Sequence, residues 1–223
     1  GVFHVEQSFF NAWRQFNKIL KQRNALLKSR PHNYAEQIKF WDVEFVKVAD
    51  QINIARKAYI ERFNAYFFDK IVGQIPIFSG LELRYDAGWK EDLASTLKAN
   101  FERDVKLGYT SKGPHKADFS FFINGHSIEN IFSRGQLKLL LYALKITQNT
   151  LIETETKKQS ILLIDDLPSE LGEETMKSVA DLLKLCQSQL FITAITAESI
   201  SAVVEPIQRE KKMFHVKHGS LTT

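Results

Sequence analysis

The sequence predicts a mixed α/β fold, α+β overall, with long helices in the first third and a strand-helix-strand unit near the end. In the first third, apolar residues recur every three or four positions, which is typical of amphipathic helices. Near the C-terminus, two short apolar runs at 161–164 and 190–195 flank another helical pattern, as parallel strands and their crossover helix do. With 223 residues, of which 44% are hydrophobic, the chain is long enough to bury a core.

The first third predicts a helical hairpin. One face of its first helix is apolar, carrying Phe9, Trp13, Phe16, Leu20 and Leu27. The opposite face is basic, carrying Arg14, Lys18, Lys21, Arg23 and Lys28. Pro31 ends this helix, and a second apolar stripe then runs from Trp41 to Tyr66. Two long amphipathic helices joined by a short turn should pack antiparallel.

The middle of the chain contains a strand, a helix and a breaker-rich loop. Residues 81–85 alternate between apolar and charged, which is the period of a half-buried strand. One further helix is indicated by Leu93, Leu97, Phe101 and Val105. The loop Gly108–Pro114 follows, and we place the domain boundary there. The predicted domains are therefore 1–108, a helical lobe, and 109–223.

The second domain should contain a βαβ unit. Residues 119–123 predict a strand, and Asn124-Gly125 is a hairpin turn signal. The runs at 161–164 and 190–195 lack alternation, so we expect both faces of these strands to be covered by helices. The crossover helix is marked by Met176, Val179, Leu182, Leu183 and Cys186. Residues 214–217, followed by His218-Gly219, predict a final edge strand.

Composition limits the class of protein. No apolar run approaches the ~20 residues that a membrane span needs, and the first residues do not show a signal-peptide pattern. The single cysteine, Cys186, excludes an internal disulfide framework and fits a reducing cytoplasm; its apolar neighbours predict that it is buried. A net charge of +4 permits an anionic partner without requiring one.

A phosphate-binding P-loop of the form G-x-x-x-x-G-K-[ST] is absent from the sequence. The chain also begins with Gly1 rather than Met. We therefore expect it to be part of a longer protein.

Ser133 and Gln136 have the spacing of a capping box, in which each side chain bonds the other's backbone N–H. The helix that follows should bury a leucine stripe, formed by Leu137, Leu140, Leu141 and Leu144. A well-capped core helix explains this pattern completely. Alternatively, Gly135 lets the backbone approach a ligand, and the free N–H groups of the helix start favour an anion such as a γ-phosphate.

Asp165 and Asp166 follow the apolar run 161–164, at the sheet edge where ligands bind in open α/β folds. Adjacent carboxylates repel, so a magnesium ion is a natural partner. Because successive strand side chains point to opposite faces, Asp165 would face the metal and Asp166 an attacking water. The alternative is a solvated acidic turn.

A third cluster, Gly113–Asp118, combines a rigid turn with polar side chains. No second histidine or cysteine stands at ligand spacing, so the pattern does not favour a metal. It is either a turn joining two domains or a basic contact to phosphate through His115 or Lys116.

Taken in order, the capped helix, the strand with two acids and the segment Ser169-Glu170-Leu171 resemble the second half of an ABC-type ATPase head. In such a head, a signature loop precedes a Walker B strand and a D-loop. Four separated motifs, in order, further resemble the RecF family of bacterial DNA replication and repair proteins. These motifs are K-Q-R-N-A-L-L from Lys21, G-P-H-K-A-D from Gly113, S-R-G-Q-L-K-L-L from Ser133 and I-D-D-L-P-S-E-L from Ile164.

The resemblance implies the C-terminal part of an ABC/SMC-like ATPase head with a helical hairpin lobe, lacking the first third that carries the P-loop. It implies a weak ATPase that uses ATP and Mg²⁺, binds double-stranded and gapped DNA as an ATP-dependent homodimer, and acts with RecO and RecR to help load RecA. Without a P-loop, this chain alone is expected to be inactive. The alternatives are a non-catalytic DNA-binding or partner-binding module and another SMC- or Rad50-like repair ATPase.

By position, the resemblance assigns Ser133, Gly135 and Gln136 to ATP bound on the opposite protomer. It makes Asp165 the magnesium ligand and Asp166 the general base. Gly172 stands where the D-loop usually has an aspartate, and Ala194 where many ABC proteins have a switch histidine. The expected DNA contacts are the cations Lys18, Lys21, Arg23, His115 and Lys116.

Overall fold

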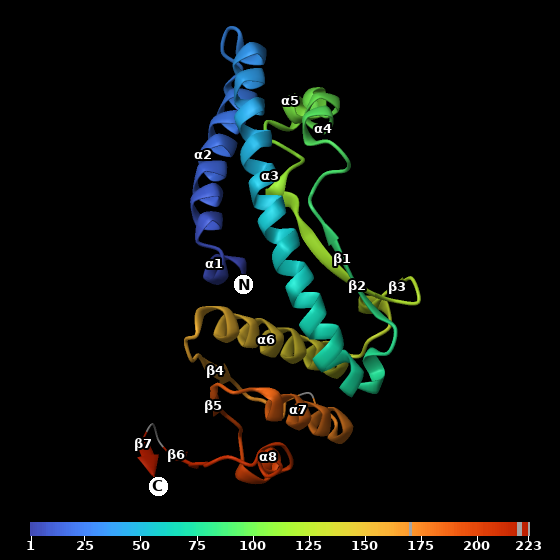
Figure 1. Cartoon of the computed structure of the whole chain (residues 1–223), viewed down its shortest axis with the longest axis vertical. Coiled ribbons are helices and arrows are strands. Elements are labelled where there is room, and N and C mark those ends of the chain that lie inside the picture. The colour runs from blue at the N-terminus through green and yellow to red at the C-terminus, as the bar shows by residue number, and fades with distance from the viewer. Residues whose placement is uncertain (170, 218–219, 223) are drawn as a thin grey trace. The chain divides into compact units, whose positions relative to one another are not determined.

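The computed structural model describes residues 1–169, 171–217 and 220–222. Contacts divide the chain into two compact units: unit 1 comprises residues 1–132 and 147–158, and unit 2 comprises 133–146 and 159–223. The fold is mixed α/β and mostly helical, as the sequence predicts (Figure 1).

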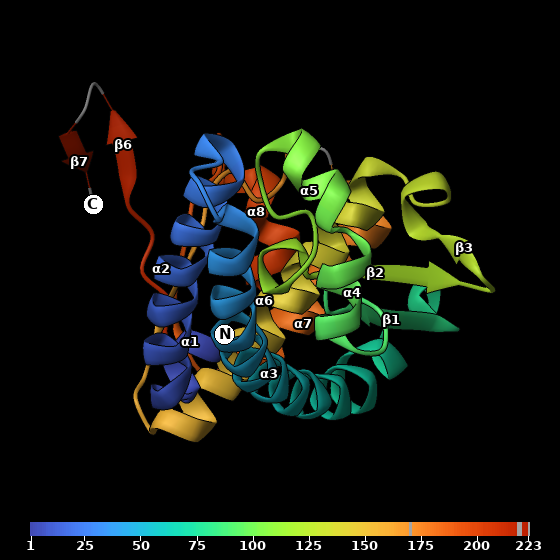
Figure 2. The same ribbon diagram turned by 90° about the horizontal axis from the view of Figure 1, so that it is seen from above.

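Unit 1 is built on a helical hairpin, which confirms the prediction for the first third. After a short α1 (Val2–Val5), helices α2 (Gln7–Ser29) and α3 (Tyr34–Tyr66) lie antiparallel and side by side (Figures 1 and 2). Arg30 ends α2 in the left-handed conformation, and its N–H bonds the Leu26 carbonyl. The core between the helices and α4 comprises Phe9, Phe16, Ile19, Phe45, Val48, Ala49, Ile52, Leu93 and Leu97.

The helix predicted around residues 93–105 is two helices, α4 (Leu93–Ala99) and α5 (Phe101–Leu107). Asn100 separates them, with φ −95° and ψ 3°. Its side-chain amide donates to the Thr96 carbonyl at 2.8 Å. Asparagine competes in this way with the backbone hydrogen bonds of a helix, which explains the break in an otherwise continuous apolar pattern.

An antiparallel sheet completes unit 1 and crosses the predicted domain boundary. Strand β1 (Leu81–Asp86) pairs with β2 (Asp118–Ile123), and β2 pairs with the two-residue β3 (His126–Ser127). Asn124 and Gly125 both have positive φ, at 49° and 80°, as the predicted hairpin turn requires. Because β1 and β2 pair across residues 108–109, unit 1 continues to Phe132. The assignment of 1–108 and 109–223 to two functional lobes stays a prediction.

Helix α6 (Arg134–Thr156) contributes its first half to unit 2 and its second half to unit 1. Its most buried apolar residues are Leu139, Leu140, Ala143 and Ile146. Leu141 is 51% exposed, so the predicted leucine stripe is wrong at this position. Leucines occur on more than one side of this helix, and leucine spacing alone did not identify the side that packs.

Unit 2 contains the predicted βαβ unit. Strands β4 (Ile161–Ile164) and β5 (Gln189–Ile192) are parallel, with Ile164 beside Ile192, and α7 (Glu173–Leu185) connects them. Helix α8 (Ala197–Val204) packs against α7. Cys186 is buried, which confirms its prediction as a small core residue.

The expectation that helices cover both faces of β4 and β5 is wrong for the described part of the chain. Ile161, Leu163 and Phe191 are 59%, 74% and 50% exposed. Leu163 and Phe191 are register partners, so their side chains share one sheet face. That face is apolar and solvent-exposed.

The predicted C-terminal strand is present in the structure. Strand β6 (His215–Lys217) pairs with β7 (Ser220–Thr222) in a separate two-stranded sheet and does not extend the β4–β5 sheet. The predicted His218-Gly219 ending lies outside the described residues. Among the helices that the structure describes, none combines the length and apolar character of a membrane span.

Candidate functional site

The acidic pair of unit 2 lies on a tight turn at the end of β4. Asp166 has a positive φ of 44°, a left-handed conformation that aspartate tolerates better than most residues. The Ser169 N–H bonds the Asp166 carbonyl at 3.2 Å, which closes the turn. Leu167, in the middle of this turn, is fully buried and anchors the turn in the core of unit 2.

Thr193, the first residue after β5, holds both acids. Its Oγ1 donates to Asp165 Oδ1 at 2.6 Å and accepts from the Asp166 backbone N–H at 2.8 Å. Its carbonyl accepts from the Leu167 N–H at 3.2 Å, and its own N–H bonds the Ile164 carbonyl at 3.0 Å. Thr193 does not belong to the site residues predicted from the sequence. The parallel pairing of the two apolar runs could have identified Thr193. Because Ile164 pairs with Ile192, the residues that follow them, Asp165 and Thr193, come to lie side by side.

Lys138 holds the same turn from α6. Its Nζ donates to the Ser169 carbonyl at 2.7 Å and, more weakly, to the Asp166 carbonyl at 3.4 Å. Burial, followed by the nearby charge of Asp166, raises the pKa of Tyr142, one turn further along α6. Lys138 is not among the predicted site residues either, because a lysine inside a helix carries no local signal of its distant partner.

The capping box that opens α6 is present. The Ser133 N–H donates to Gln136 Oε1 at 2.8 Å, and the Gln136 N–H donates to Ser133 Oγ at 3.3 Å. Ser133 is exposed, and Gly135 and Gln136 are half-buried. Lys138 therefore connects this exposed helix start to the acidic turn within one unit. The contact of these residues with ATP stays a prediction.

The residues of the turn fit magnesium only as part of a nucleotide site. Among residues 1–169, 171–217 and 220–222, no three histidine, cysteine, aspartate or glutamate side chains cluster as a metal cage would require. Magnesium is usually held by one or two carboxylates together with substrate phosphates and water. The exposed Asp165 carboxylate matches that donor set. Glu170, of the predicted D-loop, lies outside the described residues.

Arg23 corrects the predicted basic face. Its side chain is fully buried, and its guanidinium donates to Asp42 at 2.6 Å, Asp104 at 2.9 Å and Thr110 at 2.8 Å. The prediction that Arg23 contacts DNA from the exposed face is therefore wrong. Burying a charge is costly unless it is paired, and Arg23 is the centre of an internal ion-pair network.

The loop that contains His115 closes over this network. Asn24 Oδ1 accepts from the Thr110 N–H at 2.8 Å and from its hydroxyl at 2.7 Å. His115 Nε2 donates to the Thr110 carbonyl at 2.9 Å, and its ring packs on Phe16. Burial lowers the pKa of His115, so the neutral imidazole is favoured and offers a phosphate little charge. Lys18, Lys21 and Lys116 remain as the exposed cations of the predicted set.

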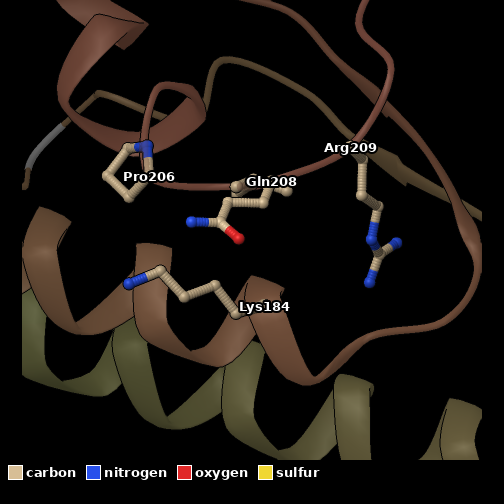
Figure 3. Close-up of a pocket in the computed structure, with 5 residues that line it drawn as sticks. Lys184, Pro206, Gln208 and Arg209 are labelled. Carbon is tan, nitrogen blue, oxygen red and sulfur yellow. The ribbon is translucent and has the colours of Figure 1, made fainter.

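A hollow of about 330 Å³ lies elsewhere in unit 2, lined by Lys184, Pro206, Ile207, Gln208 and Arg209 (Figure 3). Lys184 pairs with Asp181 at 2.7 Å, and Arg209 donates to the Ser188 carbonyl at 3.1 Å. Both cations thus bind protein groups. None of the predicted site residues lines this hollow.

Comparison with known proteins gives a consistent result, although no family model matches the chain. The DNA replication and repair protein RecF of Pseudoalteromonas translucida is 65% identical over 225 residues, which is 100% of this chain and 62% of that protein. RecF of Vibrio atlanticus is 40% identical over 99% of this chain and 60% of its own length.

Solved structures agree with the sequence matches. A structure described as the recombination mediator protein RecF-ATPrS in the RecFOR pathway aligns with a TM-score of 0.74 and 26% identity, over 97% of this chain and 59% of that one. The RecF-ATP form aligns with a TM-score of 0.70 and 27% identity. The chain is therefore a homologue of RecF that spans about 60% of the length of the relatives it matches.

Proposed function

We propose that this chain supplies the C-terminal part of a RecF-type ATPase head of the ABC/SMC class, together with its helical hairpin lobe. One observation carries the proposal: the capped start of α6 and the acidic turn after β4 are tied together through Lys138. In an ATP-dependent dimer, the helix start would serve the nucleotide of the opposite protomer and the acidic pair the nucleotide of its own, so a rigid link between them would couple the two nucleotide sites. The RecF-ATPrS and RecF-ATP forms of the solved relatives support a nucleotide as the ligand.

Each candidate residue then has a role. Ser133, Gly135 and Gln136 contact the ATP bound on the opposite protomer, because a helix start presents free N–H groups to phosphate. Asp165 binds Mg²⁺, which neutralises developing phosphate charge when it is bound. Asp166 accepts a proton from the attacking water, as a positioned carboxylate can.

The biological role follows from the relatives. They are DNA replication and repair proteins, and the solved one is a recombination mediator of the RecFOR pathway. We propose that the protein that contains this chain is likewise a recombination mediator, and further that it is a cytoplasmic, ATP-dependent homodimer that binds gapped DNA and, with RecO and RecR, helps load RecA. The exposed cations Lys18, Lys21 and Lys116 of unit 1 are the proposed DNA contacts.

The test requires a complete nucleotide site. A suitable host is the full-length P. translucida RecF with its aligned segment replaced by this chain, called here the chimera. Asp166→Asn should preserve ATP binding and slow hydrolysis by roughly 100-fold or more, because it removes the base and not the phosphate contacts. Asp181→Asn, on the exposed side of α7, is the matched control and should retain the hydrolysis rate.

Ser133→Arg tests the segment proposed to contact the nucleotide of the opposite protomer. Bulk and positive charge at the capped helix start should prevent ATP-driven dimerisation, measured by light scattering with ATP, while each protomer still binds nucleotide. A full ATP-dependent dimer with Ser133→Arg would show that the signature assignment is wrong.

A second candidate function is a non-catalytic module that binds DNA or a partner, which the exposed cations Lys18, Lys21 and Lys116 would serve. If Asp166→Asn leaves the rate of ATP hydrolysis by the chimera unchanged and the chimera still binds duplex DNA, the second function is favoured.

A further inference from the structure

The end of β5 supplies a hydroxyl that touches both acids of the proposed site. A threonine hydroxyl has one hydrogen to donate, and in Thr193 it is directed to Asp165 Oδ1 at 2.6 Å. The same oxygen accepts from the Asp166 N–H at 2.8 Å, which fixes the direction in which its hydrogen points. We propose that Thr193 is a positioning residue for the acidic pair, an inference that rests on the ATPase function proposed above.

The backbone of Thr193 is itself held by the sheet. Its N–H bonds the Ile164 carbonyl, and its carbonyl accepts from the Leu167 N–H. These bonds continue the β4–β5 ladder by one step beyond the regular strands. The hydroxyl is therefore presented from a rigid element, and the β-branched side chain restricts its rotamer.

The two bonds have different consequences for the acids. The bond to Asp165 uses Oδ1 and so orients the carboxylate that would bind magnesium. The bond to the Asp166 N–H stabilises the left-handed backbone, φ 44°, that directs the Asp166 side chain. Lys138 bonds only the carbonyls of the turn, whereas Thr193 bonds the Asp165 carboxylate and the Asp166 backbone N–H. Partners that orient a metal ligand in this way typically change metal affinity or activity by 10- to 100-fold when they are removed.

The first arm of the test uses this chain as it is. Thr193→Val keeps the shape and removes the hydroxyl. Amide hydrogen exchange of Asp166 should accelerate by about tenfold, whereas that of Leu167, bonded to the Thr193 backbone carbonyl, should change little. Equal acceleration at both amides would mean that the strand end had frayed, and would overturn the role of the hydroxyl.

The second arm measures magnesium-dependent ATP hydrolysis by the chimera. Thr193→Val should raise the Mg²⁺ concentration for half-maximal rate by roughly tenfold, and Thr193→Ser should restore it. Thr196→Val is the matched control: its hydroxyl caps α8 by accepting from the Ser199 N–H and touches neither acid. It should leave the magnesium dependence unchanged.

Two failures can be told apart. If Asp165→Asn and Asp166→Asn slow hydrolysis but Thr193→Val behaves like Thr196→Val, the positioning role is wrong and the proposed function stands. If neither aspartate variant changes the rate, the proposed function fails, and the inference fails with it.

Discussion

At the scale of single residues, the buried Arg23 network joins α2 to Asp42 of α3 and Asp104 of α5 within unit 1. Asp104 is fully buried, receives an Arg23 bond at 2.9 Å and also accepts from the Ser111 N–H at 3.0 Å. Asp104→Ala should therefore lower the free energy of unfolding by about 3–5 kcal/mol, because it leaves a buried charge without one of its partners. Urea unfolding followed by tryptophan fluorescence measures this, since Trp13, Trp41 and Trp89 all lie in unit 1.

Lys21→Ala is the matched control, because this cation lies on the same helix and is exposed. Lys21→Ala should change the free energy of unfolding by no more than about 0.5 kcal/mol. If the two variants unfold at the same urea concentration, the buried network is not what stabilises unit 1.

His115 predicts a pH dependence of stability. Burial lowers its pKa in the folded state below the ordinary 6.5, so the unfolded chain binds this proton more readily. The contribution of neutral His115 to the free energy of unfolding is complete above pH 6.5. It decreases as the pH falls from 6.5 to the pKa of His115 in the folded state. Urea midpoints measured at pH 7.5 and 5.5 should differ less in His115→Gln than in the unsubstituted chain. An equal difference in both proteins would assign the pH effect to other groups.

At the scale of elements, the start of α6 can be tested without ATP. Ser133→Ala removes the acceptor of the Gln136 N–H and should destabilise unit 2 by about 1 kcal/mol. Unit 2 contains no tryptophan, so the measurement is urea unfolding followed by amide exchange of residues in α6 and α7. Ser133→Asp keeps a capping oxygen and should retain most of the stability; a loss equal to that of Ser133→Ala would count against the cap.

At the scale of the whole molecule, this chain alone should not hydrolyse ATP. The cradle and lysine that hold the β- and γ-phosphates are missing from its sequence. The measurement is phosphate release with Mg²⁺ and ATP, compared with a blank purified in parallel. A rate above the blank that Asp166→Asn abolishes would contradict this prediction.

DNA binding is the second property at this scale. In the chimera, changing Lys18 and Lys21 together to Glu should weaken binding to any duplex sequence about equally and flatten its salt dependence by roughly one unit of slope per lost phosphate contact. The control changes the exposed Lys98 and Lys106 to Glu, an identical change of charge elsewhere in unit 1. If the two double variants bind alike, the face of α2 does not contact DNA.

Hydrophobic periodicity and short sequence motifs are sufficient to predict much of the fold. The helical hairpin, the βαβ unit, the Asn124-Gly125 turn and the Ser133–Gln136 capping box were all predicted, because each depends on residues close in sequence. The same local reasoning merged α4 with α5, because an apolar stripe does not show that Asn100 bonds the helix backbone. It also placed Arg23 on the exposed face, because helix spacing alone does not reveal a partner 81 positions away.

The sequence by itself determined the local elements of this protein and the candidate acids, since hydrogen-bonding spacing and hydrophobic period are properties of neighbouring residues. Only the tertiary structure decided which charges are buried, that one face of the β4–β5 sheet is exposed, and that Thr193 and Lys138 hold the acidic turn. The physical reason is that desolvation and ion pairing depend on what surrounds a side chain in space. Those surroundings come from segments far apart along the chain.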